Sequence, residues 1–272
     1  MSPIRGGILH LPTSHEGRYS QSLERGLAIL RTFTPERPWL GIAEIAEELE
    51  MSRPTTHRYA STLVALDYLE QGPMRKYRLG MRAGDPGRSA VGSTVLGRLS
   101  HRHLAELRDL SACTTSVALL DGTDIVYVDR ARSSVQGQIE VTARLGRGSR
   151  LAAADTAMGR MMLAHLSEQD QLAAIDVGDP GSREAIAKRK ELIAELTRIR
   201  EQGWALADQV HVQGQRCVAA PLRSRSTEVI GAVDIAAANS QFRRARALER
   251  LVLLVTVSAE RMSAELGFRP SS

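Results

Sequence analysis

The sequence predicts an α+β protein made of two units: a small helical unit that closes with a hairpin, and a larger unit built on a mainly antiparallel sheet. Two patterns lead to this prediction. In the first third of the chain, apolar residues at helical spacing precede two short strand-like runs, whereas hairpin signals alternate with long helical patterns in the remainder. With 272 residues, of which 43% are hydrophobic, the chain is long enough to fold as two domains.

Composition narrows the class of protein. The formal net charge of +5 is compatible with a polyanionic partner. The chain has only two cysteines, Cys113 and Cys217, which excludes a disulfide framework, and no apolar run reaches membrane-spanning length. Because the N-terminus also lacks the apolar core of a signal peptide, we expect a cytoplasmic protein that does not contact a membrane.

The chain begins with a tail and a helix. Residues 1–20 are rich in Gly, Pro, Ser and His without periodicity, which predicts a flexible segment. From Gln21 to Phe33 the apolar spacing becomes helical, and Ser22 is expected to cap this helix. It supplies the third helix of the first unit.

Two short helices separated by a tight turn are predicted between Leu40 and Leu66. The first carries apolar residues at helical spacing, at Ile42, Ile45, Ala46 and Leu49. The second begins with Ser52 as its N-cap and Pro54 in its first turn, where a missing N–H costs little. Such a pair is typical of a helix-turn-helix. Glu50 stands where these turns usually have glycine, so we expect the turn to close differently.

A basic hairpin follows the helix pair. Tyr68 to Gln71 and Arg75 to Leu79 are strand-like runs around a Gly72-Pro73 turn, which predicts a wing. Between Met51 and Arg82 six basic residues stand against two acidic ones, a balance of +4, whereas four glutamates lie in the helix and turn just before. This segregation predicts that the second helix and the wing bind duplex DNA.

The predicted DNA contacts divide into two kinds. The start of a recognition helix faces base edges, and basic side chains around it hold phosphates. The residues predicted to face bases are Thr55, Thr56, His57 and Arg58. Those predicted to hold phosphates are Arg53, Arg75, Lys76 and Arg78. The alternative is a small helical subdomain whose arginines are only solvated.

A change of pattern marks the boundary between the units. Glycines and a proline gather between Gly84 and Gly92, which lowers helix propensity and predicts a linker or a kinked connecting helix. Helical spacing returns from Leu96 to Leu110.

The second unit combines strands and helices. Its predicted strands are Ser116 to Leu120 and Ile125 to Val128 around an Asp121-Gly122 turn, Ile139 to Leu145, Cys217 to Leu222, and Val229 to Ala236. Its predicted helices are Ala152 to Leu166, Arg183 to Gln202, and Phe242 to Leu266. Strands in separate hairpins with helices between them favour a mainly antiparallel sheet.

Signatures of an enzyme are absent from the sequence, which has no phosphate loop, paired-histidine metal motif or nucleophile elbow. Asp208, His211 and Cys217 contain the groups of a thiol-imidazole-carboxylate set, but their short separation does not favour productive geometry, and a structural or ligand-lining cysteine is the preferred interpretation. We therefore expect no catalytic residues, no metal and no cofactor. Two segments, Asp155 to Arg160 and Gly214 to Cys217, have the small residues of ligand walls.

Six motifs together resemble the IclR family of bacterial transcription regulators. They are SLERGLAIL at Ser22 to Leu30, the helix-turn-helix Ile42 to Leu66, YRLG at Tyr77 to Gly80, LLDGTDIVYVDR at Leu119 to Arg130, DTAMGRMMLA at Asp155 to Ala164, and GQRCVAAPLR at Gly214 to Arg223. The N-terminal half is similar to regulators of the protocatechuate and β-ketoadipate branch.

The resemblance implies a domain plan and a function. The plan is a tail at 1–20, a winged helix-turn-helix at 21–82, a linker and dimerisation helix at 83–110, and a GAF-like effector-binding domain at 111–272. The family binds palindromic operators on double-stranded DNA as dimers or pairs of dimers and responds to small metabolites, often aromatic or aliphatic carboxylates. The implied effector contacts are Ala157, Met158, Gly159, Arg160, Asp208, Gln215 and Cys217.

Two alternatives to a ligand-controlled regulator remain open from the sequence. One is a metabolite-binding or hydrolytic enzyme in which the winged unit serves protein contacts. The other is an architectural DNA-binding protein that no small molecule affects.

Overall fold

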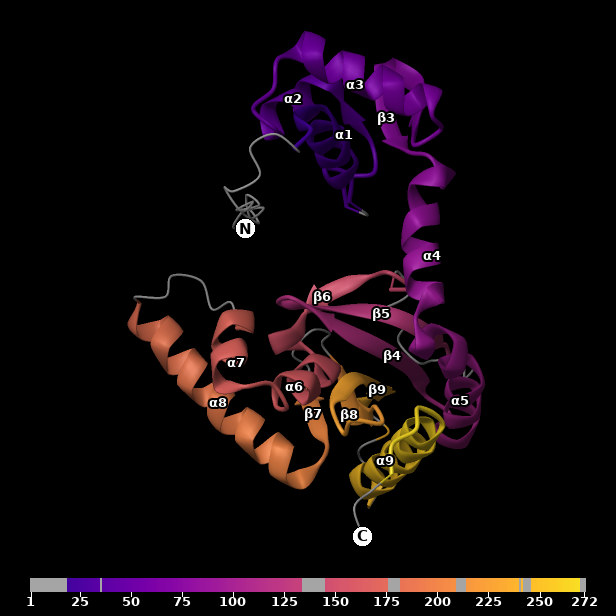
Figure 1. The fold of residues 1–272 in the computed structure, drawn as a ribbon, viewed down its shortest axis with the longest axis vertical. Helices are drawn as coiled ribbons and strands as arrows, with labels where there is room; N and C mark the ends of the chain where they lie inside the picture. The colour runs from indigo at the N-terminus through magenta and orange to yellow at the C-terminus, as the bar shows by residue number, and fades with distance from the viewer. Residues whose placement is uncertain are drawn as a thin grey trace. The chain divides into compact units, whose positions relative to one another are not determined.

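The computed structural model describes residues 19–34, 36–133, 145–175, 182–208, 214–239, 241 and 246–269. The chain divides into two compact units, one ending at Gly87 and the other beginning at Arg88 (Figure 1). The predicted tail up to residue 18 and nearly all of the predicted strand at 139–145 lie outside the described residues. Within the described parts, no helix combines the length and apolar character needed to cross a bilayer.

Three helices form the core of the N-terminal unit. They are α1 (Gln21–Arg31), α2 (Ile42–Glu48) and α3 (Arg53–Ala65). Their inward side chains pack together with those of the wing, and the fully buried members are Ile29, Leu40, Ile45, Ala60 and Leu69. The burial of these apolar side chains stabilises an otherwise small unit.

The helix caps confirm one prediction and correct another. Ser52 caps α3, as expected, and its hydroxyl accepts a hydrogen bond from the Thr55 N–H at 3.3 Å. The cap of α1 is Ser20, not Ser22, because the Ser20 hydroxyl accepts from the Leu23 N–H. Ser22 instead lies within hydrogen-bond distance of the Tyr59 hydroxyl, at 3.2 Å.

The turn between α2 and α3 closes as a glycine turn would. Glu50 has a φ of +51°, in the left-handed region that glycine usually occupies. The Met51 N–H then donates to the Ala46 carbonyl at 2.9 Å, which ends α2. The expectation of a differently closed turn is therefore wrong, since glutamate adopts the conformation itself.

The predicted wing is present as part of a three-stranded sheet. Its strands are β1 (Leu40–Gly41), β2 (Leu69–Gln71) and β3 (Lys76–Leu79), in the order β1-β3-β2, with the turn η1 (Pro73–Arg75) at the tip. The Trp39 indole braces the wing: the Arg78 guanidinium lies 5.1 Å from the ring centre, and a Cβ on Gly72 would come within 2.5 Å of the ring.

The connection between the units is helical but interrupted. It consists of η2 (Met81–Gly84), α4 (Asp85–Ser93) and α5 (Val95–Ser111). The predicted weak stretch from Gly84 to Gly92 is mostly helix, because Pro86 falls in the first turn, where proline is tolerated. The break lies two residues beyond this stretch, at Thr94, whose backbone is extended and whose hydroxyl caps α5 by accepting from the Gly97 N–H at 2.9 Å.

The C-terminal unit is built on a six-stranded antiparallel sheet. The strands are β4 (Thr114–Asp121), β5 (Asp124–Ala131), β6 (Arg150–Ala152), β7 (Ala205–Asp208), β8 (Gln215–Arg223) and β9 (Val229–Ala238). Their order is β6-β5-β4-β9-β8-β7, and every neighbouring pair is antiparallel. The predicted mainly antiparallel sheet is confirmed.

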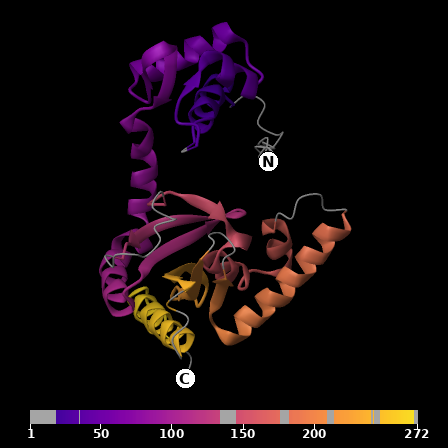
Figure 2. The same ribbon diagram turned by 180° about the vertical axis from the view of Figure 1, so that it is seen from behind.

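Helices cover both faces of this sheet (Figures 1 and 2). One face packs against α5 and α9 (Ala247–Glu265). The other carries η3 (Ala153–Asp155), α6 (Ala157–Leu163) and α8 (Arg183–Gln202), with α7 (Glu168–Ala174) alongside. Adjacent strand residues divide between the two cores, as Val117 and Ala118 do, because side chains alternate across a sheet. The predicted helix at 152–166 is thus a 3-10 turn followed by a shorter α-helix.

Candidate functional site

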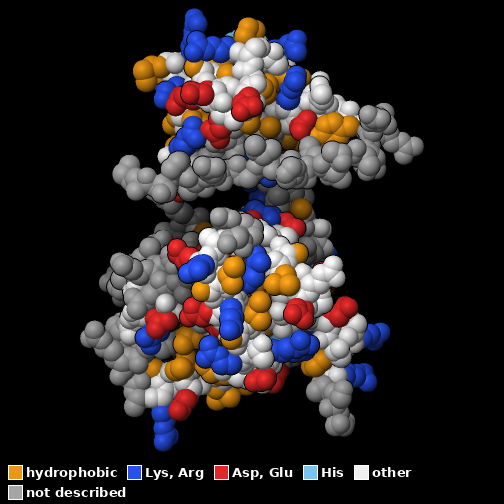
Figure 3. Space-filling view, turned by 90° about the vertical axis from the view of Figure 1, so that its left-hand side faces the viewer, with side chains coloured by type: hydrophobic (Ala, Val, Ile, Leu, Met, Phe, Trp, Pro, Cys, Tyr) orange, Lys and Arg blue, Asp and Glu red, His pale blue; other side chains and the backbone are white. Residues whose placement is uncertain are grey.

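The exposed face of α3 is basic and polar. Arg53, His57 and Arg58 are all exposed on it. Within the described part of the chain, neither Arg53 nor His57 has a side-chain hydrogen bond or ion pair. Lys and Arg side chains line the upper rim of the N-terminal unit in the space-filling view, and acidic side chains gather below that rim (Figure 3). The face therefore has the charge and exposure that phosphate and base contacts require.

One of the predicted base contacts is not available on this face, and another is only partly exposed. Thr56 is 0% exposed, and its hydroxyl donates to the Ser52 carbonyl at 3.0 Å, so the prediction that it faces bases is wrong. Its position in α3 puts it in helical phase with the buried Ala60, one turn later. Thr55 is half-buried, and its hydroxyl accepts from Ser52 at 2.8 Å.

The same periodicity identifies two residues that the sequence analysis missed. Ser61 and Thr62 are exposed and follow His57 and Arg58 by one helical turn. Both extend the outward face of α3 and carry hydroxyl groups that are able to hydrogen-bond.

The basic residues of the wing differ in their partners. Arg78 donates to Glu70 at 2.8 Å, and the Lys76 Nζ lies 3.8 Å from a Glu44 carboxylate oxygen. Arg75, at the exposed tip, has no carboxylate partner among the described residues. Arg75 is thus the wing cation that is most available for a phosphate.

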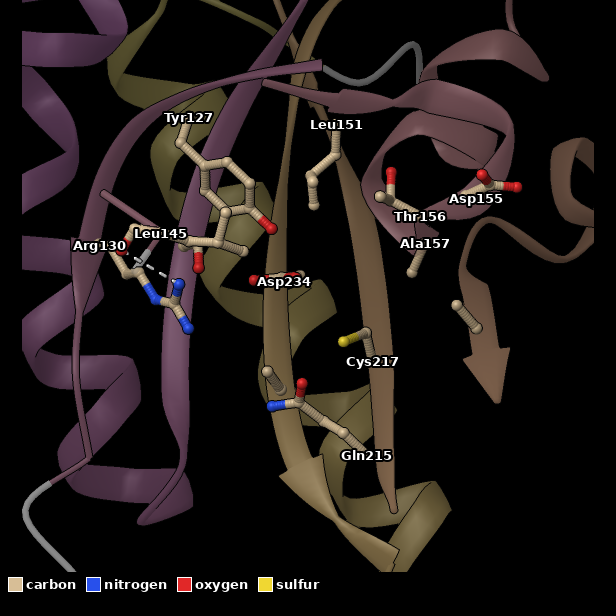
Figure 4. A pocket seen from close by; sticks show the side chains of 13 residues that line it. Tyr127, Arg130, Leu145, Leu151, Asp155, Thr156, Ala157, Gln215, Cys217 and Asp234 are labelled. Carbon is tan, nitrogen blue, oxygen red and sulfur yellow. Dashed lines mark hydrogen bonds between the residues drawn. The ribbon is translucent and has the colours of Figure 1, made fainter. Parts of the chain in front are cut away.

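A pocket lies in the C-terminal unit between the sheet and the start of α6 (Figure 4). It encloses about 490 Å³, including the part that opens to solvent. Its lining comes from all six strands, from η3 and from the first turn of α6. The lining residues are Ser116, Tyr127, Arg130, Leu145, Leu151, Asp155, Thr156, Ala157, Ala207, Gln215, Cys217, Asp234 and Ala236.

A β-bulge brings two of the polar lining residues to the same face. Val117 pairs with Asp129, whereas Ala118 pairs with Tyr127, so Val128 is the extra residue in β5. Without this bulge, strict alternation would put Tyr127 and Arg130, three residues apart, on opposite faces. The bulge is therefore what places the guanidinium beside the phenol in the pocket, 5.9 Å from the ring centre.

Arg130, Ser116 and Asp234 form one row across three strands. Ser116 on β4 pairs with Arg130 on β5 and with Asp234 on β9. Asp234 is 4% exposed. Burial raises the pKa of its carboxyl group to about 7, although Arg130 and hydrogen bonding from Ser116 act in the opposite direction. The floor of the pocket thus carries one cation and one buried acid that titrates near neutral pH.

The phenol of Tyr127 and the thiol of Cys217, which also line the pocket, stay protonated. Burial, and to a smaller extent the Asp234 charge, raise the pKa of the Tyr127 phenol and of the Cys217 thiol far above their usual ranges. A nucleophilic thiol needs the reverse shift. This argues against the thiol-imidazole-carboxylate set; its third member, His211, lies outside the described residues.

Three of the predicted effector contacts line the pocket, namely Ala157, Gln215 and Cys217. Asp208 does not line the pocket, because its carboxylate forms a bidentate ion pair with Arg216 at the surface. The preceding residue, Ala207, lines the pocket instead. Since side chains alternate along β7, the residue that faces the pocket is Ala207, one position before Asp208.

The other three predicted contacts, Met158, Gly159 and Arg160, hold the structure around the pocket. Met158 is buried in the core beneath the sheet, and a Cβ on Gly159 would lie 2.1 Å from the Ala153 carbonyl oxygen. The Arg160 guanidinium ties α6 to Glu195 on α8 at 2.8 Å. We therefore assign these residues to packing. Thr156, although it lines the pocket, caps α6 through the Gly159 N–H at 2.9 Å.

Sequence reasoning missed the polar floor of the pocket. Arg130 and Asp234 lie within or beside apolar strand patterns. A charged residue in such a pattern was the one sign in the sequence that these positions serve a site.

Comparison with known proteins identifies the family from both halves of the chain. Residues 22–73 match the IclR helix-turn-helix domain, and residues 88–264 match the bacterial transcriptional regulator IclR C-terminal domain. The chain belongs to the IclR family of bacterial transcriptional regulators. It is thus a DNA-binding regulator of transcription, and the alternative of an enzyme with an accessory winged unit is not favoured.

Relatives of this IclR protein include regulators of named systems. The HTH-type transcriptional regulator XynR of Escherichia coli K12 is 32% identical over 81% of this chain and 87% of its own length. The Pca regulon regulatory protein of Pseudomonas putida is 30% identical over 89% of this chain and 82% of its own length. A solved structure of a putative transcriptional regulator, RHA06195 from Rhodococcus sp. RHA1, has a TM-score of 0.75 at 30% identity and covers 92% of this chain and 99% of its own.

Proposed function

We propose that this IclR regulator reads its operator with the outward face of α3 and the wing, and that a small acid bound in the C-terminal pocket changes its affinity for the operator. The observation that carries the proposal is the pocket itself, which has a cation and a buried acid on its floor. A pocket lined by apolar side chains with a few polar groups among them is typical of small-molecule sites.

The DNA-binding half of the proposal rests on α3. His57 and Arg58, followed by Ser61 and Thr62, would face base edges, and Arg53 and Arg75 would hold phosphates. Thr56 is left out because it is buried.

Single substitutions separate these two roles. Arg58→Ala should lose roughly 1–3 kcal/mol of discrimination at one base position. Arg75→Ala should weaken binding to all sequences alike and reduce the slope of log affinity against log salt by about 1. Lys76→Ala should have a smaller effect than Arg75→Ala, because Glu44 already lies beside Lys76. The measurement is fluorescence anisotropy on a duplex selected from genomic fragments, at several salt concentrations.

Lys188→Ala is the matched control, because it removes one exposed positive charge from α8 in the C-terminal unit. If Arg58→Ala and Arg75→Ala bind like Lys188→Ala at every salt concentration, the assignment of α3 and the wing is wrong.

The ligand-binding half rests on Arg130, which would bind the anionic group of the effector. A solved IclR homologue from Microbacterium hydrocarbonoxydans was crystallised with 4-hydroxybenzoate; it shares this fold, with a TM-score of 0.69, 22% identity and coverage of 90% of this chain and 99% of its own. This ligand supports the aromatic members of the proposed effector class, which is the aromatic or aliphatic carboxylates.

Control of DNA binding requires two arrangements of a dimer. Residues 83–110, which contain α4 and α5, would supply the dimer contact, and pairs of dimers would form tetramers. An effector shifts the equilibrium between the arrangements only by its difference in affinity for the two.

The test combines thermal shift with release of DNA. An acid that prefers the folded regulator raises its melting temperature, and an effector also changes the affinity of the regulator for the selected duplex. Arg130→Gln should remove both responses to the acid while DNA binding without ligand persists. An acid that still acts on Arg130→Gln at full strength would refute the role of Arg130.

A further inference from the structure

The Asp234 carboxylate has one oxygen without a hydrogen bond. The Asp234 Oδ1 is buried and has no partner among the described residues, although the side chain lines the pocket. In Figure 4 the carboxylate lies between the Tyr127 ring and the Cys217 sulfur. Because a buried acceptor without a donor is costly, such an oxygen indicates where a bound molecule would hydrogen-bond.

The groups that face Asp234 do not supply this donor. Arg130 on β5, through its charge, and Ser116 on β4, through hydrogen bonding, both lower the pKa of the carboxyl group, but Oδ1 itself has no hydrogen-bond partner among the described residues. Tyr127 on β5 and Cys217 on β8 keep their protons, yet neither hydrogen-bonds Oδ1.

The charge of the lining restricts the ligand further. The described lining contains one basic residue, Arg130, and two acidic ones, Asp155 and Asp234, which gives −1 when both acids are ionised. A plain carboxylate bound at Arg130 would add a second buried negative charge near Asp234 without any hydrogen bond to offset it. A ligand that carries both an anionic group and a hydrogen-bond donor can bind Arg130 through the first and the Asp234 Oδ1 through the second.

We infer that the effector presents a hydroxyl or amino group to the Asp234 Oδ1, in addition to the anionic group that Arg130 binds. This inference rests on the proposed function, since it takes the pocket as the effector site. It makes Asp234 the residue that selects hydroxy and amino acids over the corresponding unsubstituted acids. Rejection of a ligand that lacks the donor follows from the buried oxygen that would stay unpaired.

The test compares matched acids by calorimetric titration of the full chain at pH 8. The aromatic set is benzoate, 4-hydroxybenzoate, 4-aminobenzoate and 4-methoxybenzoate, and the aliphatic set is hexanoate, 6-hydroxyhexanoate and 6-aminohexanoate. We expect a hydroxy or amino acid to bind at least about tenfold tighter than its parent. The methoxy compound, which matches the size but donates no hydrogen bond, should show no such gain.

Variants then assign the preference to Asp234. Asp234→Val removes the acceptor and should reduce the preference to within about twofold, while Asp234→Asn keeps an acceptor oxygen and should retain part of it. Glu184→Gln, an exposed change on α8, should keep the full preference. Retained binding of the selected duplex shows that each variant is folded.

Two results would contradict this inference, and only the second would also contradict the proposed effector site. Equal affinity for parent and hydroxy or amino acids, or a preference that survives Asp234→Val, overturns the inference while the pocket remains the effector site. Failure of every acid to bind overturns the effector proposal and this inference with it, while the DNA-binding assignment stands on its own measurement.

Discussion

At the scale of single residues, the backbone conformation of Glu50 forms the turn between α2 and α3, and helical phase determines which residues of α3 are exposed. Glu50 occupies the left-handed region at a position where glycine would carry no side-chain penalty. An L-residue with a side chain pays roughly 1 kcal/mol or more in that region. The surrounding helices therefore impose this conformation on Glu50, and the stability of the turn depends on which residue stands there.

Two substitutions at Glu50 should act in opposite directions. Glu50→Gly should stabilise the N-terminal unit by about 0.5–1 kcal/mol, and Glu50→Val should destabilise it by about 1 kcal/mol or more, since β-branched residues fit this conformation poorly. Urea denaturation followed by circular dichroism measures both. A Val variant as stable as the wild type would show that this turn relaxes to a different φ.

Helical phase explains which residues of α3 could have been assigned correctly from the sequence. A period of 3.6 residues puts Thr56 in the same row as Ala60 and in a different row from His57 and Ser61, so the burial of Thr56 could have been predicted had this phase been applied. Ser61 was available by the same rule. The partners of Lys76 and Arg78 were not, because Glu44 reaches Lys76 only after the wing has packed beside α2, and Glu70 faces Arg78 only in the final register of β2 and β3.

At the scale of elements, the pocket depends on a β-bulge, which the regular alternation of side chains along a strand does not predict. The extra residue at Val128 sets the phase of β5, and thereby puts Arg130 on the ligand side. Local sequence carries no sign of this bulge, since the run from Asp124 to Ala131 reads as an ordinary strand. By contrast, the bounds of α8 followed from periodicity and caps, since it begins and ends at its predicted residues, Arg183 and Gln202. The closing helix α9 was predicted from Phe242 but begins at Ala247, after Arg246 in the left-handed region.

Two glycines in helices of the C-terminal unit should respond oppositely to alanine. Gly159→Ala should destabilise the unit by about 2 kcal/mol or more, because the new Cβ would meet the backbone of Ala153 at 2.1–2.5 Å, and backbone does not yield as a side chain does. Gly92→Ala in α4 should stabilise it by up to about 1 kcal/mol, since nothing lies within 4 Å of its Cβ position.

Thermal denaturation of both variants beside the wild type measures the contrast. A Gly159→Ala protein with unchanged melting temperature and unchanged ligand affinity would show that the α6 turn is not in close contact with η3.

At the scale of the whole molecule, burial of ionisable groups couples stability to pH. The carboxyl group of Asp234 has a folded-state pKa of about 7 against an ordinary value of 3.8. Between these pH values the folded chain holds a proton that the unfolded chain has released, so the free energy of unfolding falls as pH rises through this window. Above about pH 7 the destabilisation is fully present.

Asp234→Asn should flatten this dependence. The wild type should lose on the order of 1–4 kcal/mol between pH 5 and pH 8 through this group, and the variant should lose correspondingly less. Denaturant titration of the C-terminal transition at the two pH values gives the difference. Identical pH dependence in the two proteins would exclude a raised pKa for Asp234.

The plan of the molecule was more predictable than its site. Helical spacing and hairpin signals, which are local patterns, predicted a winged helix-turn-helix followed by an antiparallel α+β domain, and the order of six motifs resembled the IclR family. The pocket joins the β4–β5 hairpin to β9, which is far from it in the sequence, so its polar row depends on strand order and register. Neither is a local property of the chain.

The packing of Trp39 under the Arg78 guanidinium has an optical consequence. The chain has two tryptophans, and the second, Trp204, follows α8 and packs partly buried against the core of the C-terminal unit. Indole emission depends on the charges and solvent around the ring, so excitation of one residue reports on the wing and excitation of the other on the domain that holds the pocket. With phenylalanine in place of either indole, the intrinsic fluorescence of the protein distinguishes docking of a duplex from occupation of the pocket without any added dye.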